Sequence, residues 1–188
     1  MKNTRSIILC LALAAGMGAA TAQDKGNTVM VGGEAMYPMK DIVANAVNSK
    51  DHTTLVAAVQ AAGLVGTLQG PGPFTVLAPT NAAFAALPAG TVDGMLKPEA
   101  KEKLTTVLTY HVLAGRFDAK SIKAAIKKGD GTATMRTVAG QELSFRLNGP
   151  NNITVWDASG RYANITIYDV FQSNGVIHVL DTVLLPKG

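Results

Sequence analysis

The apolar residues in the first half of the chain recur at the spacing of a helix. Between residues 37 and 47 they follow a 3.6-residue period, with Pro38 acceptable in the first turn, which predicts an amphipathic helix. A second helix follows, capped by Asp51 or Thr53 and stopped at Gly63, because glycine adopts the left-handed conformation that ends many helices. Two short helices are therefore predicted to open the folded part of the chain.

The next segment changes from a turn to a strand and back to a helix. Residues 69–73 read Gln-Gly-Pro-Gly-Pro, which predicts a turn, and residues 74–78 form an apolar run typical of a buried strand. Thr80 or Asn81 can then cap a short helix that carries Phe84 as an apolar anchor. We therefore predict a strand, a cap and a helix in direct succession.

Two longer helices are predicted in the middle of the chain. Pro98 suits a first helical position, and the apolar residues that follow place His111 on the inward stripe of the helix. This position favours a buried histidine with a satisfied ring nitrogen over a ligand-contacting one. Asp118 can cap the next helix, which is predicted to stop at Gly129 after two lysines.

Beyond residue 130 the hydrophobic period falls from 3.6 to two. Apolar and polar residues alternate over 143–147, 153–155 and 165–167, which predicts strands with one buried face. Short segments rich in Asn, Asp, Gly and Ser separate these strands and predict antiparallel hairpins or a meander. The predicted fold class is therefore α+β, with several short helices mainly in the N-terminal half.

The first residues have the features of an export signal. Residues 1–22 combine a basic start, an apolar core too short to cross a bilayer and a cleavage site of small residues that ends at Ala22. Residues 23–36 are small and polar, which predicts a flexible segment, and residues 37–188 then form a single domain. We expect a periplasmic or extracellular protein without a transmembrane anchor.

Composition argues against several classes of function. The chain has 17 Lys and Arg against 13 Asp and Glu, far from the strongly basic balance of nucleic-acid-binding proteins. Its one cysteine, Cys10, lies in the leader, no G-x-S-x-G motif is present, and the three histidines do not fall at metal-ligand spacings. We predict no enzyme, no cofactor and no metal site. His178 lies in strand sequence compatible with a surface, a turn or a site.

Three segments together resemble the fasciclin domain family. Residues 75–84 (Thr-Val-Leu-Ala-Pro-Thr-Asn-Ala-Ala-Phe) resemble its first signature, Tyr110-His111 its central pair, and residues 174–181 (Asn-Gly-Val-Ile-His-Val-Leu-Asp) its second signature, in family order. The resemblance covers nearly all of the chain after the leader. The signature positions expected to be structural are Thr80, Asn81, Phe84, Asn174, Gly175, His178 and Asp181.

The resemblance implies a wedge of about seven strands packed with helices, in secreted or cell-surface proteins associated with adhesion. In members that engage integrins, a tyrosine-histidine pair and an Asp-Ile before the second signature are implicated in attachment. The matching residues here are Tyr110, His111, Asp169 and Val170, with valine standing where those proteins carry isoleucine.

The leading hypothesis is an exported, non-enzymatic adhesion or interaction module. Its partner would be a surface, matrix or host protein or a glycan, with weak self-association as a further option. The alternative is a periplasmic carrier or sensor of a small apolar ligand, held in a pocket between the helices and the sheet. A large apolar cavity would favour the carrier, and a broad exposed apolar patch the adhesion module.

Overall fold

A seven-stranded sheet forms the centre of the part of the chain that the computed structural model describes, residues 28–187. The strand order is β4-β3-β9-β8-β7-β6-β5. Their bounds are Phe74–Pro79 for β3, Val112–Ala114 for β4, Thr132–Arg136 for β5, Glu142–Asn148 for β6, Asn152–Trp156 for β7, Tyr162–Gln172 for β8 and Gly175–Leu180 for β9. Together with the helices, this sheet confirms the predicted α+β class.

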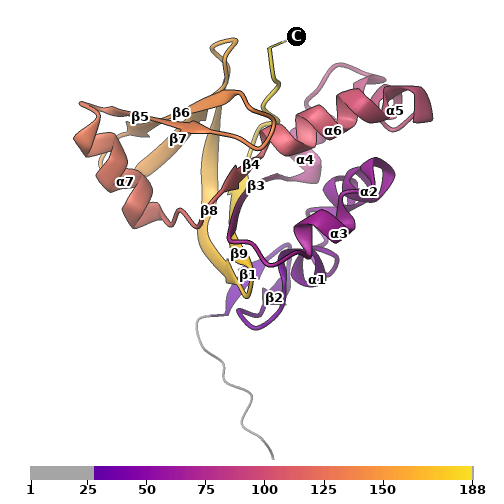
Figure 1. Ribbon diagram of the computed structural model, residues 1–188, viewed down its shortest axis with the longest axis horizontal. Helices are drawn as coiled ribbons and strands as arrows, with labels where there is room; N and C mark the ends of the chain where they lie inside the picture. Colours follow the sequence, from indigo (N-terminus) through magenta and orange to yellow (C-terminus); the bar gives the residue numbers. More distant parts are fainter. Residues whose placement is uncertain (1–27, 188) are drawn as a thin grey trace, which may run out of the picture.

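Seven α-helices and one 3₁₀ helix surround the sheet within the same range. They are α1 (Ile42–Ala46), α2 (Thr53–Ala62), α3 (Val65–Leu68), α4 (Asn81–Ala85), α5 (Thr91–Met95), η1 (Pro98–Ala100), α6 (Lys101–Tyr110) and α7 (Ala119–Lys128). Figure 1 shows α1 to α6 on one side of β3 and β9, and α7 on the other side beside β5 to β7. The helices are therefore concentrated in the N-terminal half, as predicted.

The sheet combines local hairpins with one long-range parallel pair. Strands β5 to β9 form an antiparallel meander, which confirms the prediction from the turn segments. β3 pairs with β9 in parallel, and β4 pairs antiparallel with β3. The two edges of the sheet nearly meet, because Leu113 bridges Thr137 and the amide of Val138 donates to the carbonyl of Val112 at 2.8 Å.

Two hydrophobic clusters lie on opposite faces of the central strands. The first is built from α1, α2, α4, α6 and one face of β3 and β9, including Ile177 and Val179. The second packs Ile122 and Ile126 of α7 against the other face, including Leu180, and against the inward residues of β6 and β7. All six residues of β9 are buried, because both faces of this strand are covered.

The first described residues differ from the predicted flexible segment. Val29–Val31 (β1) and Glu34–Met36 (β2) pair as an antiparallel hairpin, with Val31 and Met36 buried in the first cluster. The sequence pattern did not predict this hairpin, because each strand has only three residues and two glycines form the turn between them. The predicted leader over residues 1–22 and the first five residues of the predicted flexible segment lie outside the described residues.

Two further predictions about the helices were wrong in detail. α1 begins at Ile42 rather than near Tyr37, because Asp41 is its cap and accepts a hydrogen bond from the amide of Ala44 at 2.7 Å. Neither Asp51 nor Thr53 caps α2 with its side chain. Asn81 does so instead, by accepting from the amide of Thr54 at 2.9 Å across a gap of 27 residues.

Other local predictions were confirmed. Gly63 ends α2 with a φ of 76°, Asp118 caps α7 by accepting from the amide of Ser121, and Gly129 closes that helix. The alternation in β6 buries residues 143 and 145, but Leu147 is 42% exposed because the strand runs past the edge of the core.

Candidate functional site

The first group of signature residues joins the helices to the sheet. Thr80 caps α4 by accepting from the amide of Ala83, and Phe84 of that helix is buried in the first cluster. Asn81 donates to the carbonyl of Lys50 and to the hydroxyl of Thr53, in addition to capping α2. These side chains therefore hold α2 against the start of α4.

The second group ties the turn before β9 to the N-terminal helices. Asn174 accepts from the amide of Ile42 at 3.0 Å and donates to the carbonyls of Leu68 and Gly70 at 2.8 and 3.0 Å. Gly175 has no room for a side chain, since a Cβ there would lie 2.2 Å from the carbonyl oxygen of Phe74. Near the other end of β9, Asp181 accepts from both the amide and the side chain of Asn164.

The central tyrosine-histidine pair is buried. Tyr110 donates its hydroxyl hydrogen to the carbonyl of Glu142 at 3.1 Å, and burial raises its pKa. His111 donates from Nδ1 to the carbonyl of Val107 at 2.8 Å, and its Nε2 accepts from the amide of Leu184 at 3.1 Å. Burial lowers the pKa of His111 to about 4, so the ring is neutral near pH 7. The prediction of a buried, satisfied His111 is confirmed.

Asp169, Val170 and His178 meet where β8 is irregular. Asp169 has a φ of 55°, accepts from the amide of Ala119 at 2.7 Å and donates its own amide to Nδ1 of His178. The other ring nitrogen of His178 donates to the carbonyl of Phe117 at 2.8 Å, and Val170 is buried in the first cluster. Burial lowers the pKa of His178. His178 is therefore an internal link between β8, β9 and the start of α7.

The four residues matched to attachment positions do not form an exposed patch. Tyr110, His111 and Val170 are each at most 3% exposed, and Oδ1 of the half-buried Asp169 accepts from the amide of Ala119. Side chains in such positions hold the fold together rather than present themselves to a macromolecule. A partner that bound here could reach Asp169 but not the other three side chains.

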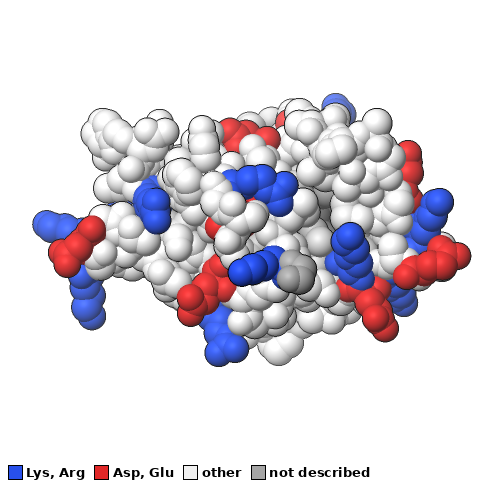
Figure 2. Space-filling view, turned by 90° about the horizontal axis from the view of Figure 1, so that it is seen from above, with Lys and Arg blue, Asp and Glu red and all other residues white. Residues whose placement is uncertain are grey.

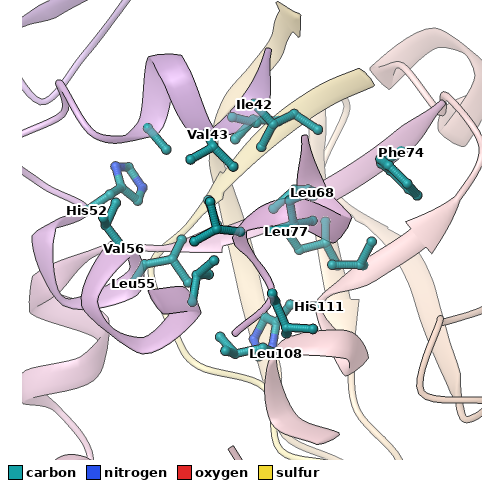
Figure 3. A pocket seen from close by; sticks show the side chains of 18 of the residues that line it. Ile42, Val43, His52, Leu55, Val56, Leu68, Phe74, Leu77, Leu108 and His111 are labelled. Carbon is teal, nitrogen blue, oxygen red and sulfur yellow. The ribbon is translucent and has the colours of Figure 1, made fainter. Parts of the chain in front are cut away.

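An apolar pocket lies between α1, α2 and α3 on one side and the sheet on the other. Its volume is about 120 Å³, it is partly open to solvent, and its lining is almost entirely apolar. Figure 3 shows Ile42, Val43, Val56 and Leu77 around this space, with Leu108 and His111 at another side of it. The polar residues among those that line it are Ser49, His52, Gln60, Thr67, Thr109 and His111.

His52 differs from the other two histidines because one of its ring nitrogens is unsatisfied. Nδ1 lies 2.8 Å from the hydroxyl oxygen of Ser49, whereas Nε2 has no hydrogen-bond partner among residues 28–187. The side chain is 3% exposed, and burial lowers its pKa against the opposing effects of the Ala78 backbone and the Asp51 charge. The Ala78 backbone that opposes this shift therefore lies close to the ring, although its contact is too poorly aligned to count as a full hydrogen bond.

The alternative function predicted a pocket between the helices and the sheet, but the sequence does not indicate that Ser49 and His52 line it. Ser49 and His52 precede α2 in a polar segment, Asn-Ser-Lys-Asp-His-Thr-Thr, that carries no apolar period. The one signal available was their spacing of three residues, which allows a side-chain contact across a tight turn.

The described residues give no support to metal binding. No group of three or more His, Cys, Asp or Glu side chains in residues 28–187 is arranged to hold a metal ion. Over the same range, none of the helices has the length and apolar character required to span a membrane.

Comparison with known proteins identifies the family of this chain. The family model described as the Fasciclin domain matches residues 50–186. The chain belongs to the fasciclin domain family. It is 46% identical over 145 residues to Protein sll1483 of Synechocystis, an alignment that covers 77% of this chain and 73% of that protein.

One further relative and one solved structure extend the comparison. The cell surface glycolipoprotein MPB83 of Mycobacterium bovis is 35% identical over 170 residues, covering 88% of this chain and 68% of that protein. A solved fasciclin domain pair from the insect cell adhesion molecule Fasciclin I has a TM-score of 0.68 at 16% identity. That match covers 79% of this chain and 51% of the pair, and it establishes the fold.

Replacing His111 tests its structural role in this fasciclin domain. His111→Ala removes the partner of the Leu184 amide and leaves a void in the core, so the free energy of unfolding should fall by about 1 to 3 kcal/mol. Tyr110→Phe removes one hydroxyl and keeps the ring, so it should lower the free energy of unfolding by less than His111→Ala does. Urea unfolding monitored by circular dichroism measures both, and unchanged stability of His111→Ala would contradict the assignment.

Proposed function

We propose that this fasciclin domain is an exported, non-enzymatic interaction module of the adhesion type, located in the periplasm or outside the cell. The name of one relative, a cell surface glycolipoprotein, and that of one structural neighbour, a cell adhesion molecule, support this proposal. Its partner is a surface, matrix or host protein or a glycan. The signal peptide over residues 1–22 is part of the proposal.

The observation that carries the proposal is a set of exposed apolar side chains in the stretch that runs from the N-terminal hairpin to the residue after α1. Met30, Tyr37, Met39 and Val47 are between 36% and 62% exposed, and all four belong to one stretch of chain. The elements of this stretch lie together at the lower edge of Figure 1. Exposed apolar surface of this kind is typical of protein-protein contact.

The upper face of the molecule carries charges of both signs. On the face in Figure 2, Lys and Arg side chains are interspersed with Asp and Glu. No single-sign field of the kind that captures nucleic acid is apparent on that face. A nucleic-acid partner is therefore not expected at this face, which lies opposite the lower edge of Figure 1.

A charge-insertion experiment tests this surface. The double variant Met30→Glu with Met39→Glu should weaken binding to surface extracts of the source cells about tenfold, because a desolvated charge opposes apolar contact. Leu147→Glu is the matched control, since Leu147 is also exposed but lies on β6. Surface plasmon resonance measures the binding. Equal affinity of the unmodified protein, the double variant and Leu147→Glu would overturn the assignment.

A second candidate function is favoured by the apolar pocket. A carrier or sensor of a small apolar ligand requires an apolar space between helices and sheet, and the pocket of about 120 Å³ has this location and lining. An engineered cavity of about 150 Å³ in another protein binds benzene, so the volume suits a molecule of about one ring.

Filling the pocket distinguishes the carrier from the adhesion module. Val56→Phe places an aromatic ring in the pocket, whereas Ala57→Phe places the same ring on the exposed face of the same helix. Benzene binding, measured by ligand-observed NMR, should fall at least fivefold in Val56→Phe and stay unchanged in Ala57→Phe. No binding of benzene by the unmodified protein would remove this candidate and leave the adhesion proposal standing.

A further inference from the structure

A row of side chains crosses the outer face of the antiparallel meander. Successive strands place four residues directly opposite one another, namely Thr134 of β5, Ser144 of β6, Trp156 of β7 and Tyr162 of β8. The residues that alternate with them along β6 and β7 are buried in the second cluster, on the side that α7 covers. The row therefore faces away from α7, and Tyr162 is 49% exposed.

Two aromatic rings and one guanidinium group form a continuous stack on this face. The ring centroids of Trp156 and Tyr162 lie 5.0 Å apart, and the rings are tilted by 31°. The guanidinium carbon of Arg146 lies over the other ring, 5.0 Å from the centroid of Trp156. Arg146, Trp156 and Tyr162, here named the aromatic platform, span three strands and hence about 10 Å.

The aromatic platform is held in place from beneath. Nε1 of Trp156 donates to the hydroxyl of Thr154 at 3.0 Å, and that hydroxyl donates to the carbonyl of Arg146 at 3.2 Å. Thr154 is 4% exposed, so this link is internal. Because the polar group of the indole is satisfied within the protein, its ring orientation is fixed before any ligand arrives, which lowers the entropic cost of binding.

The groups beside the aromatic platform are polar and mostly uncharged. A second row lies two residues along each strand and consists of Thr132, Arg146, Thr154 and Asn164. Arg146 is the one charged residue in these two rows. Thr134 is exposed, and Ser144 and Asn164 are half-buried, so their hydroxyl and amide groups can exchange hydrogen bonds with a ligand.

The size and charge of this surface indicate the class of its ligand. Two rows across four strands cover on the order of 100 Å², well below the roughly 800 Å² that each partner buries in a stable protein complex. One arginine does not supply the several cations that a nucleic-acid backbone requires. A sugar ring with equatorial hydroxyls fits both features, because its flat C–H faces pack on aromatic rings and its rim carries uncharged hydroxyls.

We infer that the outer face of β5 to β8 binds a short stretch of a neutral glycan. Its rings pack on the aromatic platform, which is wide enough for about two of them, and its hydroxyls bond to Thr134, Ser144 and Asn164. This inference rests on the proposed interaction function, because it names a glycan as a partner. It concerns a surface separate from residues 30–47, which lie at the lower edge of Figure 1.

The protein carries its own reporter for this site, because Trp156 is the one tryptophan of the chain. Cellotetraose, a neutral oligosaccharide with equatorial hydroxyls, should shift the tryptophan emission to shorter wavelength in a saturable titration, because it displaces water from the indole. Backbone amide chemical shifts should change on β6, β7 and β8. Sorbitol carries similar hydroxyls without a ring, and it should change neither signal.

A substitution that keeps the reporter tests the aromatic platform itself. Tyr162→Ala removes its most exposed ring and should weaken cellotetraose binding about fivefold. Tyr37→Ala is the matched control, because Tyr37 is also exposed but lies in the N-terminal stretch, and it should leave the affinity unchanged. The double variant Met30→Glu with Met39→Glu should likewise bind cellotetraose as the unmodified protein does.

The outcomes separate this inference from the function on which it rests. No change in emission or amide shifts at about 10 mM cellotetraose, which detects millimolar dissociation constants, would overturn the inference and leave the adhesion proposal standing. An equal response to sorbitol, or an equal loss in Tyr162→Ala and Tyr37→Ala, would also overturn it. A loss confined to Tyr162→Ala supports it, whatever the double variant does in the extract-binding test.

Discussion

Lowering the pH from 7 to 4 should remove several kcal/mol from the free energy of unfolding of this domain. His52, His111 and His178 are all buried, and burial lowers the pKa of each below the ordinary value of 6.5. A group of this kind is neutral in the folded state but takes up a proton in the unfolded state below pH 6.5. Its stabilising contribution is therefore complete above pH 6.5 and is lost as the pH falls toward the folded-state pKa.

The contribution of His111 sets the scale of this effect. A folded-state pKa of about 4 against 6.5 when unfolded corresponds to about 3 kcal/mol, all of it lost between these two values. His52 and His178 act in the same direction and add to the loss. Asp118 and Asp157 also have lowered pKa values, but their contribution falls away below the ordinary value of 3.8, at lower pH than that of the histidines.

Urea unfolding at a series of pH values measures the proton uptake directly. At pH 5 unfolding should take up between about one and three protons, the range set by His111 alone and by all three histidines. His111→Ala should lower this number by about one at the same pH. Stability that stays constant from pH 7 to 4.5, or a His111 resonance that titrates near 6.5 in the folded protein, would contradict the prediction.

The parts of the fold that the sequence predicted well are those fixed by local interactions. The apolar run of β3, the Asp118 cap and the stop of α7 at Gly129 each depend on neighbours a few residues away. The parallel pairing of β3 with β9 depends on residues about a hundred positions apart, and no period or turn signal encodes it. The prediction of the α2 cap was wrong for the same reason, because the capping side chain, Asn81, comes from a later element of the chain.

The candidate site was harder to predict than the fold. A pocket is the space left where side chains from several elements do not fill the core, so it depends on tertiary packing and not on spacing along the chain. The resemblance to fasciclin domains singled out Tyr110 and His111, but both are fully engaged in internal hydrogen bonds. Ser49 and His52 lie outside the signature segments, and the unsatisfied Nε2 became visible only with its surroundings.

Asp157 is the second residue whose replacement should have a large effect. Its carboxylate is fully buried. Asp157 follows β7 in a turn that the sequence predicted, but the contact with the Leu185 amide, 28 residues away, was not predicted. Oδ1 accepts from the amides of Ser159 and Arg161 and from the Ser159 hydroxyl, at 2.9, 3.0 and 2.7 Å. Oδ2 accepts from the amide of Leu185 at 3.2 Å and lies 3.3 Å from the Arg161 guanidinium.

These contacts keep the carboxylate charged although it is buried. Burial alone would raise the pKa of Asp157, but the hydrogen bonds from Ser159, Leu185 and Arg161 together lower it. The same oxygens hold the segment after β9 against the turn between β7 and β8. Leu184 and Val183, on this segment, fill the two hydrophobic clusters, so the carboxylate positions core residues as well as its own turn.

Asp157→Ala should therefore reduce the free energy of unfolding by about 2 to 4 kcal/mol, because it leaves several partly buried donors without their charged acceptor. Asp157→Asn should lower the free energy of unfolding by less, because its amide oxygen can still accept the hydrogen bonds made to Oδ1. The bond from the Leu185 amide is lost, since the asparagine NH2 group cannot accept it. Asp93→Ala, at an exposed aspartate, should change stability by less than about 0.5 kcal/mol. Hydrogen exchange should show the Leu185 amide losing protection first in Asp157→Ala, because its acceptor is gone. Equal stability of Asp157→Ala and Asp93→Ala would mean that the C-terminal segment is held by apolar packing alone.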